Sequence, residues 1–505
     1  MKSSSDLASK PHPAKPGEAY WKQVRKPFLI AISGSFILLQ LLFLGNMCYL
    51  YGTQFRSSSR YHNFNVLLVD YDGGVIGQSL LAAYHELKGN DFPTLIQNNA
   101  TDYPDPQNIY ESVCRGDYWA AVYTNPGASS RLSSALASST AATSYNNSDA
   151  ITYIWNGARY PTIAKSAIYA NVQTLVAAAH VAYNHLNGRA AGKSIDWSNE
   201  AIAQILFNPI AASEIDIKPT NQGTRVLYNT VSMVFPIIQQ FFFIMALNGI
   251  SSSFGLFSKL LPVQNGRLRM NLSAAYTLIG SLCSAGYLWA FREDWDVNGL
   301  QFFLTWMALW LYMHINFLVM DVATGYLQMQ FMPFFVLTWV VFNIASVVSP
   351  FEVNPAFYRW GYALPTHEVY QVLVQIWSGD CEKQLYRSLP ILFAWWVVSL
   401  ALSILSTSHR CKAAVAAERT SALPPSEEQG LDTESTADES KDDSAENKGA
   451  PLSRTTPSNG TTLVTRPADL AAIRRQTAES IRLEQRAYGP SYPTPFVHRQ
   501  SVDEQ

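Results

Sequence analysis

The sequence predicts an α-helical polytopic membrane protein with six transmembrane helices and an α/β extracytoplasmic domain inserted between helices 1 and 2. Two observations predict this fold class. Charge-free apolar runs of membrane-spanning length occur once before residue 56 and five times after residue 225. The long segment between them has ordinary polarity and alternates strand-like with helix-like patterns. An α-helix crosses the ~30 Å hydrocarbon layer in about 20 residues, and a central charge costs roughly 2.5–3.5 kcal/mol.

The amino end predicts an uncleaved membrane anchor. Residues 1–26 are polar, and Lys22, Arg25 and Lys26 stand directly before the apolar run 27–51. No small-residue cleavage pattern closes this run, so it is typical of a signal anchor. By the positive-inside rule, the three basic residues favour a cytosolic tail over residues 1–26 and a transmembrane helix over 27–51.

Residues 52–228 are expected to form the extracytoplasmic α/β domain. Strand patterns occur at 64–70, 92–96, 118–123 and 150–155, and helical patterns at 76–87, 106–115, 132–136 and 160–186. Alternating strands and helices are typical of a compact α/β fold. Asn99 and Asn146 begin glycosylation sequons, which fits a lumenal or external location.

Residues 229–408 are expected to form a five-helix membrane domain. Its spans are predicted at 229–250, 271–291, 299–320, 328–349 and 388–408. Counted from a cytosolic amino end, basic residues then fall on the cytosolic side, at 259–269 and 409–412, and acidic residues on the outer side, at 293–296. The charge asymmetry therefore favours cytosolic amino and carboxyl ends.

The carboxyl end, residues 409–505, is expected to be a disordered cytosolic tail. Residues 426–448 contain nine Asp or Glu against two Lys and almost nothing apolar. Such a segment cannot bury enough apolar surface to offset the cost of ordering its backbone. The acidic tail would offer a binding segment to a cytosolic partner.

Five polar residues in the predicted spans are candidates for a membrane path: Gln239, Gln240, His314, Asn316 and Asn343. Polar side chains at this depth must face other helices or water, and ionisable ones are functional hypotheses. The alternative is interhelical hydrogen bonding, which contributes about 0.6 kcal/mol per bond and needs no transport role.

Composition and incomplete motifs argue against other classes of protein. The chain has 505 residues, of which 48% are apolar, and a formal net charge of −2, so nothing indicates nucleic acid as a partner. Residues 187–194 approach a phosphate-binding loop but begin with Asn187 in place of glycine. His85-Glu86 and His367-Glu368 lack the second histidine of a zinc-protease motif. We therefore expect no enzyme, no catalytic residues, no cofactor and no metal site.

Three stretches carry a resemblance to a known family: FNVLLVDYDGGVIG at 64–77, DYWAAVYTNPG at 117–127 and PAFYRWGYALPTHEVYQVLVQIWSG at 355–379. Over roughly residues 20–410 the chain resembles a fungal membrane-protein family named for nitrosoguanidine resistance. The architecture of that family is similar to the membrane subunit of ABC-2-type exporters, with one span, a large outer α/β domain and five further spans.

The resemblance implies a permease-like protein of the plasma membrane that exports, or gives resistance to, toxic amphipathic drugs or lipids. It implies membrane lipids and a second copy of the chain as partners, and it carries over no binding residues. The alternative function is a non-transporting membrane organiser or scaffold that affects plasma-membrane lipid composition. Cys114 and Cys381 both fall in segments expected outside, and the sequence leaves open whether they form a disulfide.

Overall fold

The computed structural model describes residues 19–422, so most of the two predicted tails lies outside the described residues. The chain divides into two compact units. One contains the residues up to Ile244 together with Gly266–Thr407, and the other contains Met245–Asn265 and the residues from Ser408 onward. The first unit holds both the α/β portion and the greater part of the apolar helices.

The α/β portion contains a five-stranded mixed sheet in the order β2-β1-β3-β4-β5, and only the β3–β4 pair is antiparallel. Its strands are β1 (Asn65–Asp70), β2 (Thr94–Asn98), β3 (Ala120–Thr124), β4 (Ile151–Trp155) and β5 (Ala212–Asp216). Four of them lie where the sequence predicts strands. The fifth strand, β5, has no counterpart among the sequence predictions.

Helices connect and cover the strands. They are α2 (Val75–Leu87), α3 (Pro106–Cys114), α4 (Ala128–Ala137), α5 (Ser139–Ser144), α6 (Pro161–Ile163), α7 (Ala170–Tyr183), α8 (Arg189–Ser194) and α9 (Glu200–Phe207). Short 3-10 turns are η1 (Ser58–Asn63), η2 (Asn147–Asp149) and η5 (Gly223–Leu227), and π-helical turns are η3 (Ala164–Tyr169) and η4 (Asn184–Gly188). The predicted helix at 160–186 is thus a run of α and π turns from Pro161 to Ser194.

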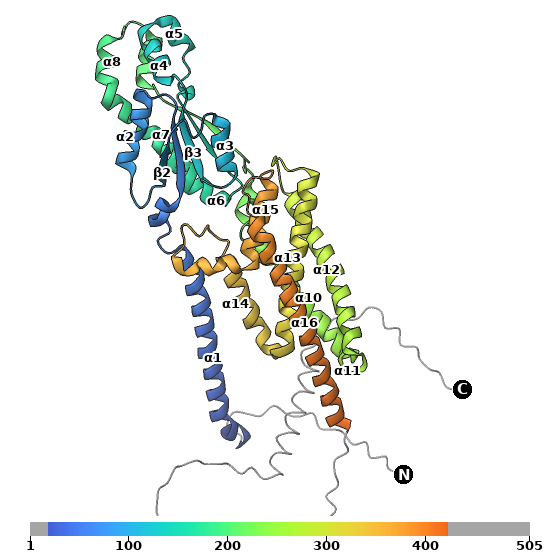
Figure 1. The fold of residues 1–505 in the computed structure, drawn as a ribbon. Coiled ribbons are helices and arrows are strands. Elements are labelled where there is room, and N and C mark those ends of the chain that lie inside the picture. The colour runs from blue at the N-terminus through green and yellow to red at the C-terminus, as the bar shows by residue number, and fades with distance from the viewer. Residues whose placement is uncertain (1–18, 423–505) are drawn as a thin grey trace, which may run out of the picture. The chain divides into compact units, whose positions relative to one another are not determined.

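The core of the sheet follows from the alternation of side chains along its strands. Leu67 and Val69 of β1 point to one face, where they pack with Ile109 and Val113 of α3. The opposite face carries α2 and α7 (Figure 1). Because both faces are covered, β1 reads as a continuous apolar run.

The remaining helices are α1 (Ala19–Gln54), α10 (Val231–Ser253), α11 (Leu256–Lys259), α12 (Pro262–Ala290), α13 (Gly299–Tyr326), α14 (Met332–Ala345), α15 (Pro365–Trp377) and α16 (Leu385–Ala422), with 3-10 turns η6 (Met329–Phe331) and η7 (Ala356–Ala363). Within residues 19–422, four helices are long and apolar enough to cross a membrane: those at Trp21–Gln54, Val231–Ser253, Gly299–Tyr326 and Leu385–Thr420. The prediction of six spans is therefore confirmed only in part.

The two other predicted spans differ for physical reasons. α12 is long enough, but its charge-free part carries Ser273, Thr277, Ser281 and Ser284 besides two glycines, which lower its apolar character. α14 has 14 residues, which at 1.5 Å per residue reach only about 21 Å. An absence of charge is thus a weaker criterion than helix length and apolar content together.

The end of α13 also differs from the prediction. The sequence places a span end at 320, yet the helix continues through Asp321 to Tyr326. Asp321 is buried and forms an ion pair with Arg269 of α12, and its second carboxylate oxygen accepts from Ser403 of α16 at 2.5 Å. A charge inside the helix is tolerated because opposite charge and a hydroxyl satisfy it.

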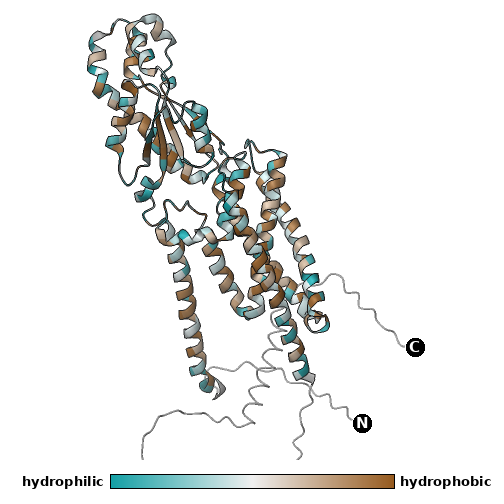
Figure 2. Ribbon diagram, viewed as in Figure 1, coloured by the Kyte–Doolittle hydropathy of each residue, from teal (hydrophilic) through white to brown (hydrophobic). Residues whose placement is uncertain are grey.

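α1 touches the rest of its unit through one end only. Asn46 Nδ2 donates to Thr338 Oγ1 at 3.3 Å, and Gln54 Nε2 donates to Ser349 Oγ at 2.7 Å. The most apolar stretch of α1 is 0% buried, and a Cβ atom added at Gly34 would meet no other atom within 4 Å. Hydrophobic colours run along this helix in Figure 2. Its amino-terminal half therefore exposes apolar surface on all sides.

Candidate functional site

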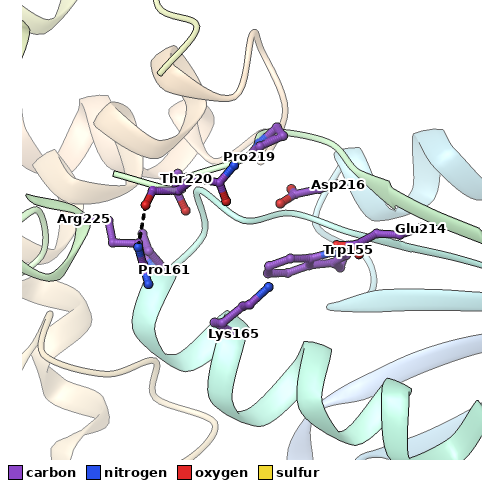
Figure 3. A pocket seen from close by; sticks show the side chains of 9 residues that line it. Trp155, Pro161, Lys165, Glu214, Asp216, Pro219, Thr220 and Arg225 are labelled. Carbon is purple, nitrogen blue, oxygen red and sulfur yellow. Dashed lines mark hydrogen bonds between the residues drawn. The ribbon is translucent and has the colours of Figure 1, made fainter. Parts of the chain in front are cut away.

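A cavity of about 490 Å³ lies at the β5 edge of the sheet, on the face that α7 covers. Its walls come from β4, β5, η3 and the segment that leads toward α10, and Figure 3 shows them from close by. The lining residues are Trp155, Pro161, Lys165, Glu214, Asp216, Pro219, Thr220, Asn221 and Arg225. Charged groups of both signs and one tryptophan therefore meet in one hollow.

The strand register places the acidic side of this cavity. Glu214 and Asp216 are two residues apart on β5, so their side chains leave the sheet on the same face. Their parallel partners on β4 are Tyr153 and Trp155, respectively. Glu214 Oε1 accepts from Trp155 Nε1 at 2.9 Å, and Glu214 Oε2 accepts from the Tyr153 hydroxyl at 3.0 Å.

Within the described residues, only one carboxylate oxygen of Asp216 accepts hydrogen bonds. Its Oδ1 accepts from the backbone N–H of Gly157 at 2.8 Å and from that of Lys218 at 3.1 Å. The pKa of Asp216 is raised to about 6, chiefly by burial and to a smaller extent by Glu214, while the two N–H donors and Lys165 oppose this shift. The carboxyl group therefore keeps its proton to a higher pH than an ordinary aspartate does.

The basic side of the cavity comes from a strained corner of the chain. Tyr160 has a φ of +51°, a left-handed conformation that is rare for a large side chain, and the π-helical turn η3 follows it. Both features re-aim side chains, and Lys165 of η3 extends beneath Trp155 in Figure 3. Its Nζ lies 3.6 Å from the Tyr169 ring centroid and 5.4 Å from that of Trp155.

Arg225 completes the lining from the side nearest α10. Its Nη1 donates to the carbonyls of Asn221 and Gln222, at 2.9 and 3.1 Å. In Figure 3 it lies on the opposite side of the cavity from Asp216 and Glu214. The segment that carries Arg225 continues through Tyr228 into α10.

A disulfide and a buried ion cluster fasten the α/β portion to the segment after α15. Cys114, the last residue of α3, is bonded to Cys381. Beside it, Arg159 Nε lies 3.1 Å from Glu382 Oε1, and its guanidinium stacks 3.6 Å from the Trp119 ring centroid. Burial raises the pKa of Glu382, and Arg159 opposes the shift. The sequence leaves open whether Cys114 and Cys381 pair, and the structure shows that they form a disulfide.

Two of the predicted path residues belong to a closed ring of hydrogen bonds. Asn343 Oδ1 accepts from Thr366 Oγ1 at 2.7 Å, and Asn343 Nδ2 donates to the Trp339 carbonyl at 2.8 Å. Trp339 Nε1 donates to Asn316 Oδ1, whose amide donates to the Tyr312 carbonyl, both at 2.9 Å. The Tyr312 hydroxyl lies 2.6 Å from Thr366 Oγ1 and closes the ring. This ring joins α13, α14 and α15.

The other three predicted path residues have separate surroundings. His314 accepts from Trp396 Nε1 at 3.0 Å and lies 3.3 Å from Ser273 Oγ. Gln239 lies against Gly280 of α12, where an added Cβ would be 2.8 Å from its amide. Gln240 is fully buried, and its amide has no hydrogen-bond partner within the described residues. The structure thus brings Asn316 and Asn343 together but not all five.

The two sequons are both accessible. Asn99 is exposed in the loop after β2. Asn146 is also exposed, and its Oδ1 accepts from the Ser148 backbone N–H at 3.1 Å. A glycan is attached to the amide nitrogen Nδ2, and the hydrogen bond of Asn146 engages only Oδ1, so both asparagines can carry one.

Sequence reasoning missed the cavity because it missed β5. The signal was present: Glu214, Asp216 and Lys218 alternate with Ile215 and Ile217, which is the period of a strand with one polar face. The pairing of this strand with β4, which creates the hollow, depends on a partner some 60 positions away and has no local signature.

The fold and site define an integral membrane protein with several apolar helices and a mixed-sheet α/β portion that carries a charged cavity. A family model described as "Protein of unknown function (DUF3533)" matches residues 35–401. The chain belongs to this family. The membrane character predicted from the resemblance is confirmed, while nitrosoguanidine resistance and an ABC-2-type role are not shown by this match.

One relative is an uncharacterized endoplasmic reticulum membrane protein of Saccharomyces cerevisiae. It is 24% identical over 320 residues, which are 60% of this chain and 61% of the relative. The chain thus matches somewhat less than two thirds of that relative's length. No solved structure matches this chain.

Proposed function

We propose that this protein is a permease-like exporter that handles toxic amphipathic drugs or lipids and has no nucleotide-binding domain of its own. The observation that carries the proposal is the direct link from the charged cavity to a candidate span. Pro219, Thr220, Asn221 and Arg225 line the cavity, and α10 begins at Val231. A ligand that moves this lining would therefore act on the first turn of α10.

The link is stiff enough to transmit such a movement. Tyr228 is 1% exposed and stacks on Trp295, with ring centroids 5.0 Å apart. Gln222 Nε2 donates to the Tyr228 hydroxyl at 2.9 Å, and Asn229 Nδ2 donates to the Val347 carbonyl at 2.9 Å. Buried, hydrogen-bonded aromatic residues resist independent motion, so the segment and its neighbours shift together.

Transport by purified protein in liposomes tests the proposal. We expect movement of a fluorescent lipid or an amphipathic dye, and a reduced rate in the double variant Glu214→Gln with Asp216→Asn. Asp102→Asn, an exposed acid outside the cavity, is the matched control. Protein that moves neither compound, with or without an ion gradient, would overturn the proposal.

Pairing of two copies is part of the proposal, because a single set of helices does not enclose a path in ABC-2-type proteins. It is supported by the exposed half of α1, where Ala31 and Ser35 are four residues apart and so place two small residues on one face, the spacing that membrane helices use to associate. Ser35→Cys in a background with both Cys48→Ser and Cys283→Ser should cross-link two chains in native membranes. Leu29→Cys in the same background is the control. A specific contact should cross-link the Ser35→Cys variant more strongly than the Leu29→Cys variant, whereas random collision would cross-link the two variants equally.

A second candidate is a non-transporting membrane organiser. The ring through Asn316 and Asn343 favours it, because these polar groups are occupied with each other. Deletion of residues 423–505 separates the two functions. An organiser that recruits partners through its acidic tail should lose its cellular phenotype, whereas a permease should keep most of its transport. The plasma membrane is our proposed location, with both ends cytosolic, although the relative's name places that protein in the endoplasmic reticulum membrane.

A further inference from the structure

We propose that the cavity at the β5 edge binds a zwitterion, a small group that carries an ammonium close to a phosphate. This inference assigns the substrate class of the pocket on which the proposed function rests. It extends that function from amphipathic compounds in general to those with this type of headgroup.

The acidic side of the cavity, formed by Glu214 and Asp216, has acceptor sites left for an ammonium group. Asp216 Oδ2 accepts no hydrogen bond within the described residues, while Oδ1 is fixed by two backbone N–H groups. Each oxygen of Glu214 accepts one bond from the sheet, and a carboxylate oxygen offers about two acceptor sites. Trp155 adds an aromatic wall next to these oxygens. Carboxylates beside an aromatic face are a favourable setting for an organic cation.

The basic side of the cavity, formed by Lys165 and Arg225, has hydrogen-bond donors left for a phosphate group. Lys165 forms no ion pair within the described residues, and its ammonium rests on the Tyr169 ring. Two backbone carbonyls hold Arg225 through Nη1 alone, which leaves donors on Nη2 and Nε. Arginine forks and lysine ammonium groups are the side chains that proteins use for phosphate oxygens.

The combination of charges excludes ligands of a single sign. Two carboxylates face two cations across one hollow, and Lys165 does not lie within ion-pair distance of either Glu214 or Asp216. A simple cation would meet Lys165 and Arg225, and a simple anion would meet Glu214 and Asp216. A ligand with both charges satisfies both walls. The volume of about 490 Å³ lies within the range of small-molecule sites.

Either a lipid headgroup or a free zwitterion could supply this chemistry, so the experiment has two arms. The full-length chain is placed in nanodiscs of phosphatidylglycerol, which has no ammonium. Calorimetry then measures the binding of free O-phosphoethanolamine in one arm and of short-chain phosphatidylethanolamine in the other. Ethanolamine alone and inorganic phosphate alone are the single-charge probes.

We expect the zwitterion to bind more tightly than either single-charge probe in at least one arm. Asp216→Asn and Lys165→Met should each weaken this binding by about tenfold to a hundredfold, the size of a lost charge-assisted hydrogen bond. Asp102→Asn and Lys88→Met, exposed changes of the same charge outside the cavity, should leave it unchanged. Binding of the free compound identifies a soluble source, and binding of the lipid alone identifies a headgroup.

The inference is overturned if neither arm shows binding, if a single-charge probe binds as tightly as the zwitterion, or if both cavity variants bind like wild type. An intact Cys114–Cys381 disulfide in each variant shows that its outer portion has folded. Binding needs no gradient and no transport, so the liposome assay can fail while this assay succeeds, and the reverse also holds.

Discussion

At the scale of single residues, the ionisation of Asp216 depends on the charged groups that face it. Glu214 stands beside it on the same strand, and Lys165 faces it from η3. Lys218 follows it but pairs with Asp296, and Arg225 lines the far side of the cavity. Burial has the largest effect and raises the pKa of Asp216 to about 6. The folded state therefore binds a proton more tightly than the unfolded chain does.

The sign of the resulting pH dependence follows from that shift. The cost of ionising Asp216 in the fold is absent below about pH 4 and grows as the pH rises to about 6. Asp216→Asn should therefore raise the thermal unfolding midpoint relative to wild type above pH 6, and match it below pH 4. The measurement is thermal unfolding in detergent from pH 3.5 to 8, with Asp102→Asn as control. Identical profiles for the variant and wild type would contradict the assigned burial.

Arg159 is expected to matter for stability more than an ordinary surface arginine. Its side chain is 12% exposed and faces Glu382, whose side chain is 2% exposed. Arg159→Ala leaves that carboxylate buried without its counter-charge, which costs about 3–5 kcal/mol. Arg115→Ala is the matched control, because the Arg115–Asp117 pair is roughly half exposed and worth at most about 1 kcal/mol. Chemical denaturation of both variants measures the difference, and equal losses would show that the buried cluster is not needed.

At the scale of elements, the disulfide joins two segments that composition alone could not pair. Cys114 ends α3 and Cys381 follows α15, 267 positions later in the chain. The sequence indicated that both cysteines face the same compartment, but not that their Cα atoms come within bonding range. Only the packing of α3 against the segment after α15 decides this, because a bond of this kind depends on distance and direction.

Removal of this bond should loosen the attachment of the α/β portion. Cys114→Ser together with Cys381→Ser should lower the free energy of unfolding by about 2–4 kcal/mol, since the closed loop is long. Limited proteolysis should show faster cleavage near residues 378–384. Cys283→Ser, which changes an exposed free cysteine, should have neither effect. A double variant that resists protease like wild type would show that the ion cluster alone holds the two segments.

The helices show how far local composition predicts an element. Charge-free runs predict α10, α13 and α16, and all three are confirmed as apolar helices of spanning length. α13 runs past its expected end because Arg269 and Ser403 satisfy Asp321 from other helices. A prediction from local composition ends a span at a charged residue, whereas the fold can bury that residue when another helix supplies a partner for it.

At the scale of the whole molecule, the compartment of the α/β portion is a proposal that glycosylation can test. If this portion faces the lumen or the exterior, Asn99 should carry a glycan in fungal cells. Treatment with an endoglycosidase should then increase the electrophoretic mobility of the wild type. Asn99→Gln and Asn146→Gln should each remove part of the shift, because both side chains are exposed.

The control for this test is the double variant with both asparagines replaced, which should show no shift. Protease added to sealed cells or microsomes provides an independent check. Digestion of the α/β portion from the cytosolic side only would contradict the proposed orientation. The disulfide supports the orientation, because such bonds persist in oxidising compartments.

The sequence by itself determined that this is a membrane protein with apolar helices and an α/β portion of alternating strands and helices. It could do so because hydrocarbon rejects charge and because strands and helices have distinct periods, and both properties are local. Tertiary structure alone decided the pairing of β5 with β4, the cavity beside it, the Cys114–Cys381 bond and the partner of Asp321. Each of these depends on which distant segments meet, and pairing energies between distant residues leave no periodic trace along the chain.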